Sequence, residues 1–254
     1  MSLSREQMLI EMGLGPIWRV REQEPLCEVR EEPVVEPVKI QLSPQVTNTA
    51  PNTQTVAVDG LDWPNLSKQV AECRSCALCQ QRKQAVLGVG DRQADWLFVG
   101  EGPGAEEDVQ GEPFVGQAGK LLDNMLAALD LKRDSKVYIA NAVKCRPPGN
   151  RTPENAEMAA CRPYLERQIA LIKPKIIVLL GKAAVHSVLH EDKTLASMRG
   201  QRFEYQGIPT IVTYHPAYLL RNLPEKAKAW EDLLLARRFL RQASATPSNP
   251  DLPF

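Results

Sequence analysis

Two patterns of hydrophobic and polar positions alternate between about Leu61 and Ala243. Four short apolar runs rich in β-branched residues predict strands at 96–100, 136–143, 175–181 and 209–214. Apolar residues at helical spacing predict helices over 116–131, 153–172 and 182–190, and a last helix with Pro224 in its first turn. Apolar strands alternating with helices are typical of a parallel sheet covered on both faces. We therefore predict a three-layer α/β/α fold with a central four-stranded parallel sheet.

The segments outside this core have a different composition. Residues 1–23 hold one short amphipathic pattern, which a capping box at Ser4–Gln7 opens, and we expect a short helical docking peptide there. Residues 24–60 are rich in Pro, Val, Thr, Asn and Gln, which predicts a disordered linker, and residues 244–254 read as a flexible tail. One domain is therefore expected over 61–243.

The chain has no apolar run of the roughly 20 residues that a membrane span needs. Its N-terminus lacks the basic and apolar regions of a signal peptide. We expect a cytoplasmic protein with no membrane partner, in which cysteines serve as thiols or metal ligands. Its net charge of zero shows no global basic field for nucleic acid, although a local basic group would suffice.

Ligands of parallel α/β folds bind at the carboxyl ends of the strands, so the loops that follow the strands are the places for chemistry. The first such loop, Gly100–Ala105, formally fits the glycine fingerprint of dinucleotide-binding proteins. Acidic residues crowd it, however, and no Lys or Arg occurs between the strand and Lys120. We expect this loop to bind something other than an anion.

Five of the six cysteines lie in the core region. Cys73 and Cys76 form a C-x-x-C pair with Cys79 three residues on, and fifteen residues separate Cys145 from Cys161. Two adjacent and two distant thiols can supply four ligands to one centre. Buried free cysteines, a zinc site and an iron–sulfur cluster all remain open from the spacing alone.

Three separated motifs resemble the family 4 uracil-DNA glycosylases, which are repair enzymes that carry a 4Fe–4S cluster. The motifs are VGEGPGAEEDVQGEPFVGQAGKLLD, NAVKCRPPGNRTPENAEMAACRPYL and YHPAYLLR, and the resemblance covers about residues 68–240. It implies a uracil-DNA glycosylase fold and cluster ligands at Cys73, Cys76, Cys145 and Cys161. Cys79 takes the place of a polar residue in that pattern, so we do not expect it to ligate.

The resemblance also implies roles in the pocket. Phe114 would stack on an extruded uracil, and backbone groups of Gly100, Glu101 and Gly102 would lie along its edge. Asn141 would pair with uracil O4 and N3–H, His215 would donate a hydrogen bond to O2, and Glu101 would orient the attacking water. The structural alternatives are a core aromatic at Phe114, a turn residue at Asn141 and a structural histidine.

Around this pocket we expect DNA contacts. Leu219 and Leu220 would wedge into the base stack, and Arg221 would hold a phosphate. Arg146, together with Arg151 and Arg162, would face the DNA backbone. No lysine occurs in GEGPG or YHPAYLLR to form a Schiff base, so we expect plain hydrolysis that leaves an abasic site.

The expected partner is uracil-containing DNA, bound by a monomer. The rival hypothesis is a non-catalytic module of the same fold that is tethered to the replication clamp loader. Residues 1–23 loosely resemble the N-terminal peptide of the psi subunit of bacterial DNA polymerase III, which docks on that assembly. This resemblance implies clamp-loader proteins as possible partners of the peptide.

Overall fold

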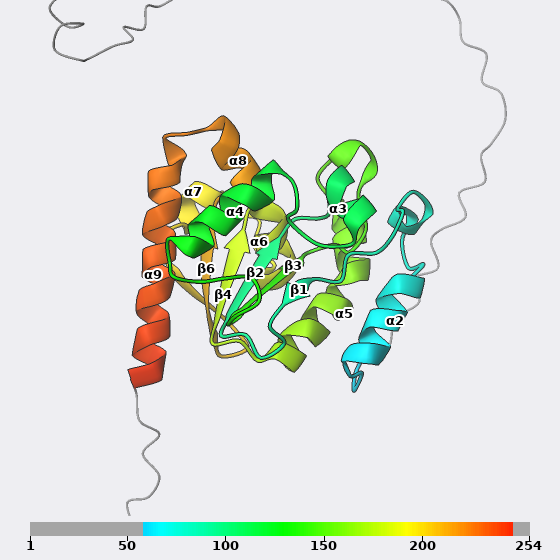
Figure 1. Ribbon diagram of the computed structural model, residues 1–254, viewed down its shortest axis with the longest axis horizontal. Helices are drawn as coiled ribbons and strands as arrows, with labels where there is room; N and C mark the ends of the chain where they lie inside the picture. The colour runs from blue at the N-terminus through cyan, green and yellow to red at the C-terminus, as the bar shows by residue number, and fades with distance from the viewer. Residues whose placement is uncertain (1–57, 246–254) are drawn as a thin grey trace, which may run out of the picture. The chain divides into compact units, whose positions relative to one another are not determined.

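The computed structural model describes residues 58–245, so the predicted docking peptide, the linker up to residue 57 and the tail from residue 246 lie outside it. Its centre is a six-stranded sheet in the order β1-β3-β2-β4-β6-β5 (Figure 1). The strands are β1 (Val89–Gly90), β2 (Trp96–Gly100), β3 (Val137–Asn141), β4 (Ile176–Leu180), β5 (Arg202–Tyr205) and β6 (Ile208–Thr213).

The four predicted strands form the parallel centre of this sheet, because β2 pairs in parallel with β3 and β4, and β4 pairs in parallel with β6. Every residue of β2, β3 and β4 is buried, as expected for strands covered on both faces. The two edge strands were not predicted. β1 pairs antiparallel with β3, and β5 pairs antiparallel with β6.

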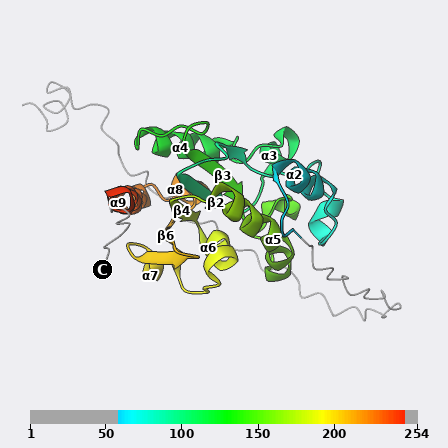
Figure 2. The ribbon, with the colours of Figure 1, turned by 90° about the horizontal axis from the view of Figure 1, so that it is seen from below.

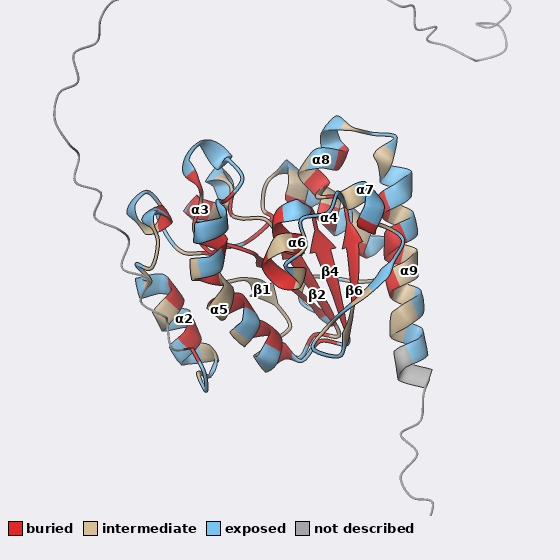
Figure 3. Cartoon of the chain, turned by 180° about the vertical axis from the view of Figure 1, so that it is seen from behind, coloured by how far each residue is buried: buried red, intermediate tan, exposed pale blue. Residues whose placement is uncertain are grey.

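Helices cover both faces of the sheet, which confirms the three layers (Figure 2). One face packs against α4 (Gln117–Ala127) and α9 (Glu225–Ala245) through residues such as Leu122, Leu126 and Leu233. The other packs against α5 (Asn155–Ile172), α6 (Lys182–Leu189) and α7 (Leu195–Met198). The buried sides of these helices face the strands in Figure 3.

The remaining elements are short and lie around the core. They are α2 (Trp63–Glu72), α3 (Ala105–Gln110), α8 (Pro216–Arg221) and two 3₁₀ turns, η1 (Ala77–Gln80) and η2 (Pro148–Asn150). No helix was predicted between the first strand and residue 116, but part of this acidic segment forms α3. No helix within residues 58–245 is both long enough and apolar enough to cross a bilayer.

Candidate active site

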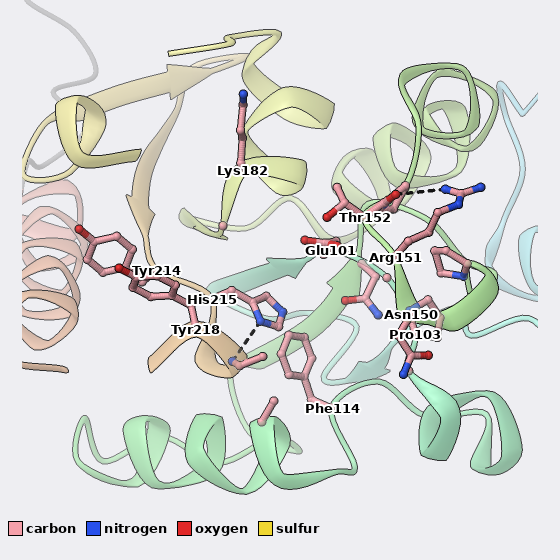
Figure 4. Close-up of a pocket in the computed structure, with 18 of the residues that line it drawn as sticks. Glu101, Pro103, Phe114, Asn150, Arg151, Thr152, Lys182, Tyr214, His215 and Tyr218 are labelled. Carbon is pink, nitrogen blue, oxygen red and sulfur yellow. Dashed lines mark hydrogen bonds between the residues drawn. The ribbon is translucent and has the colours of Figure 1, made fainter. Parts of the chain in front are cut away.

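A cavity of about 710 Å³ opens at the carboxyl ends of the parallel strands (Figure 4). Residues that follow β2, β3, β4 and β6 line it, as the fold predicts. It brings together most of the predicted site residues, namely Glu101, Gly102, Phe114, Asn141, His215 and Arg221. Gly100 is not part of the cavity wall.

Gly100 instead makes room for its neighbours. It pairs with Asn141 in the parallel register of β2 and β3. A Cβ atom at position 100 would lie 2.5 Å from Asn141 Oδ1 and 2.6 Å from the ring of Phe114. Only glycine therefore allows these two side chains to meet above the end of β2.

The acidic loop is held by its own carboxylates. Glu107 accepts hydrogen bonds from three backbone N–H groups, those of Gly104 at 3.0 Å, Val115 at 3.0 Å and Gly116 at 3.2 Å. Buried Asp108 accepts one from Lys83 N at 2.9 Å. Two of the acids in this segment, Glu107 and Asp108, are thus structural anchors, a role that their sequence pattern did not indicate.

Phe114 owes its position to this anchoring. Its backbone is left-handed, with φ of 57°, which is unfavourable for a bulky residue. Arg133 donates to the carbonyl oxygens of Pro113 and Phe114. A Cβ atom on Gly119 would lie 1.7 Å from the Phe114 carbonyl oxygen, so helix α4 can pass only because residue 119 is glycine. The surroundings therefore hold a strained conformation that points an aromatic ring into the cavity.

Asn141 is 2% exposed and ends β3. Its Oδ1 is buried and has no hydrogen-bond partner among the described residues. A buried acceptor without a partner costs about 1–3 kcal/mol, which favours a ligand that supplies the missing donor. The side-chain amide thus offers one acceptor and one N–H donor group to whatever fills the cavity.

His215 lies against Phe114, with ring centroids 5.4 Å apart and planes inclined by 28°. Its Nδ1 accepts a hydrogen bond from Ala217 N at 3.2 Å, so the proton of the neutral ring is on Nε2. Burial, and secondarily the charge of Arg221, lowers the pKa of His215 to about 4. The ring is therefore a neutral N–H donor at physiological pH.

Glu101 lies across the cavity beside Thr152 (Figure 4). Burial raises the pKa of the Glu101 carboxyl, although a hydrogen bond from Thr152 opposes the shift. A carboxylate with a raised pKa is a better proton acceptor than an ordinary one. The cavity therefore combines a base, a neutral donor and a bifunctional amide.

The predicted DNA contacts are only partly placed at the cavity. Leu219 is 1% exposed and packs with Tyr214 and Ala229, so the structure does not support its role as a wedge. Leu220 is 40% exposed and remains a candidate. Arg221 lines the cavity, and its contact with a phosphate stays a prediction.

Other basic residues have partners or lie elsewhere. Arg151 lines the cavity but donates two hydrogen bonds to Glu157, at 2.7 and 2.8 Å. Arg146 binds the Asn150 side chain at 2.7 Å and is not part of the cavity wall. Lys182 lines the cavity, but its side chain extends away from Glu101 and His215 (Figure 4).

A second, small cavity gathers the cysteines. Its lining includes the four predicted ligands, Cys73, Cys76, Cys145 and Cys161, and also Cys79, which was not expected to ligate. Arg82 donates to Cys145 Sγ at 2.8 Å, and Lys144 N donates to Cys161 Sγ at 3.2 Å. Within residues 58–245 no three ligating side chains are grouped as a single metal ion would require.

The two buried thiols of this cavity, those of Cys145 and Cys161, are protonated in the absence of metal. Burial raises the pKa of Cys145 to about 11 and that of Cys161 to about 12. Metal binding would displace these protons. The N–H groups that already point at both sulfurs would then stabilise the thiolates.

Lys144 connects the two cavities. Its side chain is fully buried, and Nζ donates to the Asn141 carbonyl oxygen at 2.9 Å and to Gln168 Oε1 at 2.5 Å. Its backbone N–H contacts Cys161. One residue therefore joins the end of β3 to the cysteine site.

The chain is similar in sequence to proteins of one superfamily over most of the described residues. The sequence profile of the Uracil DNA glycosylase superfamily matches residues 87–234. A type-4 uracil-DNA glycosylase of Thermotoga maritima is 41% identical over 181 residues, which are 70% of this chain and 94% of the relative. One of Sulfurisphaera tokodaii is 43% identical over 191 residues, 72% of this chain and 84% of the relative. A type-5 enzyme of Mycobacterium leprae is 29% identical over 197 residues, 61% and 84% of the two chains.

Proposed function

This chain belongs to the type-4 branch of the uracil-DNA glycosylase superfamily, and we propose that its cavity hydrolyses uracil from DNA and leaves an abasic site. The observation that carries this proposal is the buried Asn141 Oδ1, which has no hydrogen-bond partner within residues 58–245 and lines the same cavity as the rings of Phe114 and His215. Uracil N3–H supplies the missing donor, and uracil O4 accepts from the Asn141 amide. Cytosine presents the reversed pattern, with an amino donor at C4 and an acceptor at N3, and is excluded.

The bond that breaks joins C1′ of the deoxyribose to N1 of uracil. Its electron pair leaves with the base, and the developing negative charge spreads onto O2. The neutral His215 ring donates its Nε2–H to O2, which stabilises that charge in the transition state. Phe114 holds the extruded base by stacking on its face.

Glu101 acts on the sugar side of the same bond. Its carboxylate stabilises the positive charge that develops on the deoxyribose and orients a water molecule toward C1′. The water oxygen bonds to C1′, and Glu101 accepts the released proton, which passes to the uracil anion or to solvent. Lys182 is the only lysine among the described residues that lines the cavity, and its side chain extends away from Glu101 and His215 (Figure 4). We therefore expect no Schiff base and no strand cleavage.

The experiment uses oligonucleotides with one uracil, single-stranded and paired, and scores abasic sites by alkaline cleavage. We expect excision from uracil DNA and none from matched cytosine or thymine DNA. His215→Ala should lower the single-turnover rate about 100- to 1,000-fold while DNA affinity changes little. Absence of abasic sites with the parent protein would instead favour the rival, a non-catalytic binding module.

We also propose that Cys73, Cys76, Cys145 and Cys161 hold a 4Fe–4S cluster. These thiols converge from the end of α2, the start of η1, the segment after β3 and helix α5. A cluster separates its four ligands more widely than a single ion does. When bound, the cluster would cross-link these elements covalently. Arg82 contributes from the protein side, since it contacts Cys145 Sγ and the Cys73 carbonyl oxygen at 3.0 Å.

Metal analysis of protein purified without air tests this assignment. We expect a brown protein with about four iron atoms per chain. Cys145→Ala should lose the iron and much of the thermal stability. Cys79→Ala, a change in the same cavity, should retain both. Zinc without iron in the parent protein would refute the cluster.

A further inference from the structure

Three side chains form a continuous stack beside the active site. The Arg199 guanidinium lies 4.7 Å from the centre of the Tyr214 ring. The rings of Tyr214 and Tyr218 stack with centroids 4.9 Å apart and planes inclined by 28°. Arg199 is itself fixed by Asp232, which is 1% exposed and accepts its Nε–H at 2.7 Å. The stack therefore extends from the buried Arg199–Asp232 ion pair to the surface, and each of its side chains is held by contact with the next.

Its outer end is at the mouth of the cavity. Tyr218 lines the cavity together with His215 and is 37% exposed. Only four large apolar side chains of the described residues are exposed, and three of them are Tyr218, Leu220 and Leu223. Exposed apolar side chains concentrated within six positions beside a cavity mark a binding surface.

We propose that Tyr218 is a stacking platform for the DNA base next to the extruded uracil. This inference rests on the proposed function. When one nucleotide leaves the stack, its neighbour exposes an aromatic face at the mouth of the cavity that receives the flipped base. An aromatic ring accepts any base by stacking, so the contact adds affinity without reading sequence.

The surrounding groups suit this occupant better than a protein or lipid surface. Arg221 follows Tyr218 by one helical turn, lines the same cavity and can pair with the phosphate of the neighbouring nucleotide. The rings and guanidinium of Tyr214 and Arg199 already restrict the Tyr218 ring in the free protein. The ring therefore loses little conformational entropy when DNA binds, and the surface is preorganised. Leu220, on the adjacent position of α8, is left to fill the space that the uracil vacates.

A cycle between the protein ring and the DNA base tests the platform. Fluorescence anisotropy would measure the dissociation constant for single-stranded DNA that carries 2′-fluorodeoxyuridine, whose fluorine destabilises the sugar cation and suppresses excision. In companion strands the base on one side of this nucleotide, and then on the other, is replaced by an abasic analogue. The proteins are the parent, Tyr218→Ala, Tyr218→Phe and, as a matched exposed control, Leu223→Ala.

We expect Tyr218→Ala to weaken binding about tenfold, and removal of one neighbouring base to weaken parent binding by a similar factor. When Tyr218→Ala binds DNA that lacks this base, the two losses of affinity should not multiply, because each change removes the same contact. Tyr218→Phe should bind like the parent, whereas the small loss in Leu223→Ala should multiply with base removal. Circular dichroism and thermal melting would establish that each variant is folded.

The platform would be overturned if the affinity losses from Tyr218→Ala and from base removal multiplied for the base on either side of the uracil. It would also be overturned if Tyr218→Phe lost as much affinity as Tyr218→Ala. The parent is also assayed for excision on ordinary deoxyuridine DNA. Excision with multiplying losses would refute the platform alone, whereas absence of excision would refute the proposed function.

Discussion

Glu101 and His215 share one cavity, and burial acts on their protonation in opposite directions. Burial disfavours the charged form of each group, so it raises the pKa of the Glu101 carboxyl and lowers that of the His215 ring to about 4. The active state needs a charged Glu101 and a neutral His215. As the pH falls, protonation of Glu101 is therefore the change that removes the active state.

The pH profile of excision follows from this difference. We expect kcat/KM to fall through one acid limb located above the usual glutamate pKa of about 4.3, because protonation removes the Glu101 carboxylate. No limb should occur near 6.5, since His215 is already neutral there. Glu101→Gln should lower the rate at neutral pH about 100-fold or more and abolish the limb. A limb near 6.5 that disappears in His215→Gln would contradict the assignment.

Substitution of Asn141 tests base recognition. Asn141→Asp replaces the amide donor by a carboxylate oxygen, which repels uracil O4. We expect kcat/KM on uracil DNA to fall on the order of 100-fold, and the uracil-to-cytosine ratio to fall with it, because the carboxylate can accept from the cytosine amino group. Excision rates on paired substrates give both quantities. An unchanged rate on uracil DNA would place the base reader elsewhere.

Sequence indicated the identities of these residues better than their surroundings. The resemblance implied roles for Asn141 and His215, and both residues lie at the carboxyl end of a strongly apolar strand. Leu219 and Leu220 are adjacent leucines, and only the phase of α8 decides which one is buried. The role of Glu107 was hidden because two of its partners, Val115 and Gly116, are eight and nine residues away.

At the scale of elements, charged side chains hold the segment between β2 and α4, which includes α3. Glu107 receives three N–H groups within it, and Arg133 caps carbonyl oxygens at its far end. Together they hold Phe114 in its left-handed conformation. The position of the stacking ring therefore depends on the Glu107 and Arg133 side chains.

Glu107→Gln tests how much the segment between β2 and α4 contributes to stability and to activity. The amide nitrogen cannot accept from the loop, so at least one of the three hydrogen bonds is lost and Phe114 moves. We expect the free energy of unfolding to fall by about 1–3 kcal/mol and kcat/KM to fall about tenfold. Urea denaturation and the excision assay measure the two effects. Exposed Glu106→Gln, on the same helix, is the control and should change neither.

The central strands could be predicted because their long apolar runs leave little alternative. The edge strands could not. β1 has only two residues, and β5 alternates between exposed and half-buried positions. Such strands form because a neighbouring strand offers unpaired backbone groups, and this information is not local to their own sequence.

At the scale of the whole molecule, all the site residues lie within residues 58–245, while the peptide over 1–23 lies outside the described part. Val58 is 7% exposed in the cluster of buried residues around Cys145, so a truncation should end at residue 57. We expect deletion of residues 1–57 to leave uracil excision unchanged.

The same deletion tests the proposed docking peptide. A short anchor joined by a flexible tether raises the local concentration of the enzyme near its partner. Co-purification with clamp-loader proteins should therefore be lost in the truncated chain and retained in the full chain. Equal recovery from both would refute the partner, and reduced excision by the truncated chain would show that the segment belongs to the catalytic unit.

Lys144 has a consequence for protein engineering. Its Nζ donates a hydrogen bond to the backbone carbonyl oxygen of Asn141, and the Asn141 side chain takes no part in that bond. The residue at 141 can thus be exchanged while Lys144 keeps its hydrogen bonds to Gln168 and Cys161. Position 141 is accordingly the point at which libraries for excision of other modified bases should begin, and Lys144 is the residue that such libraries should leave untouched.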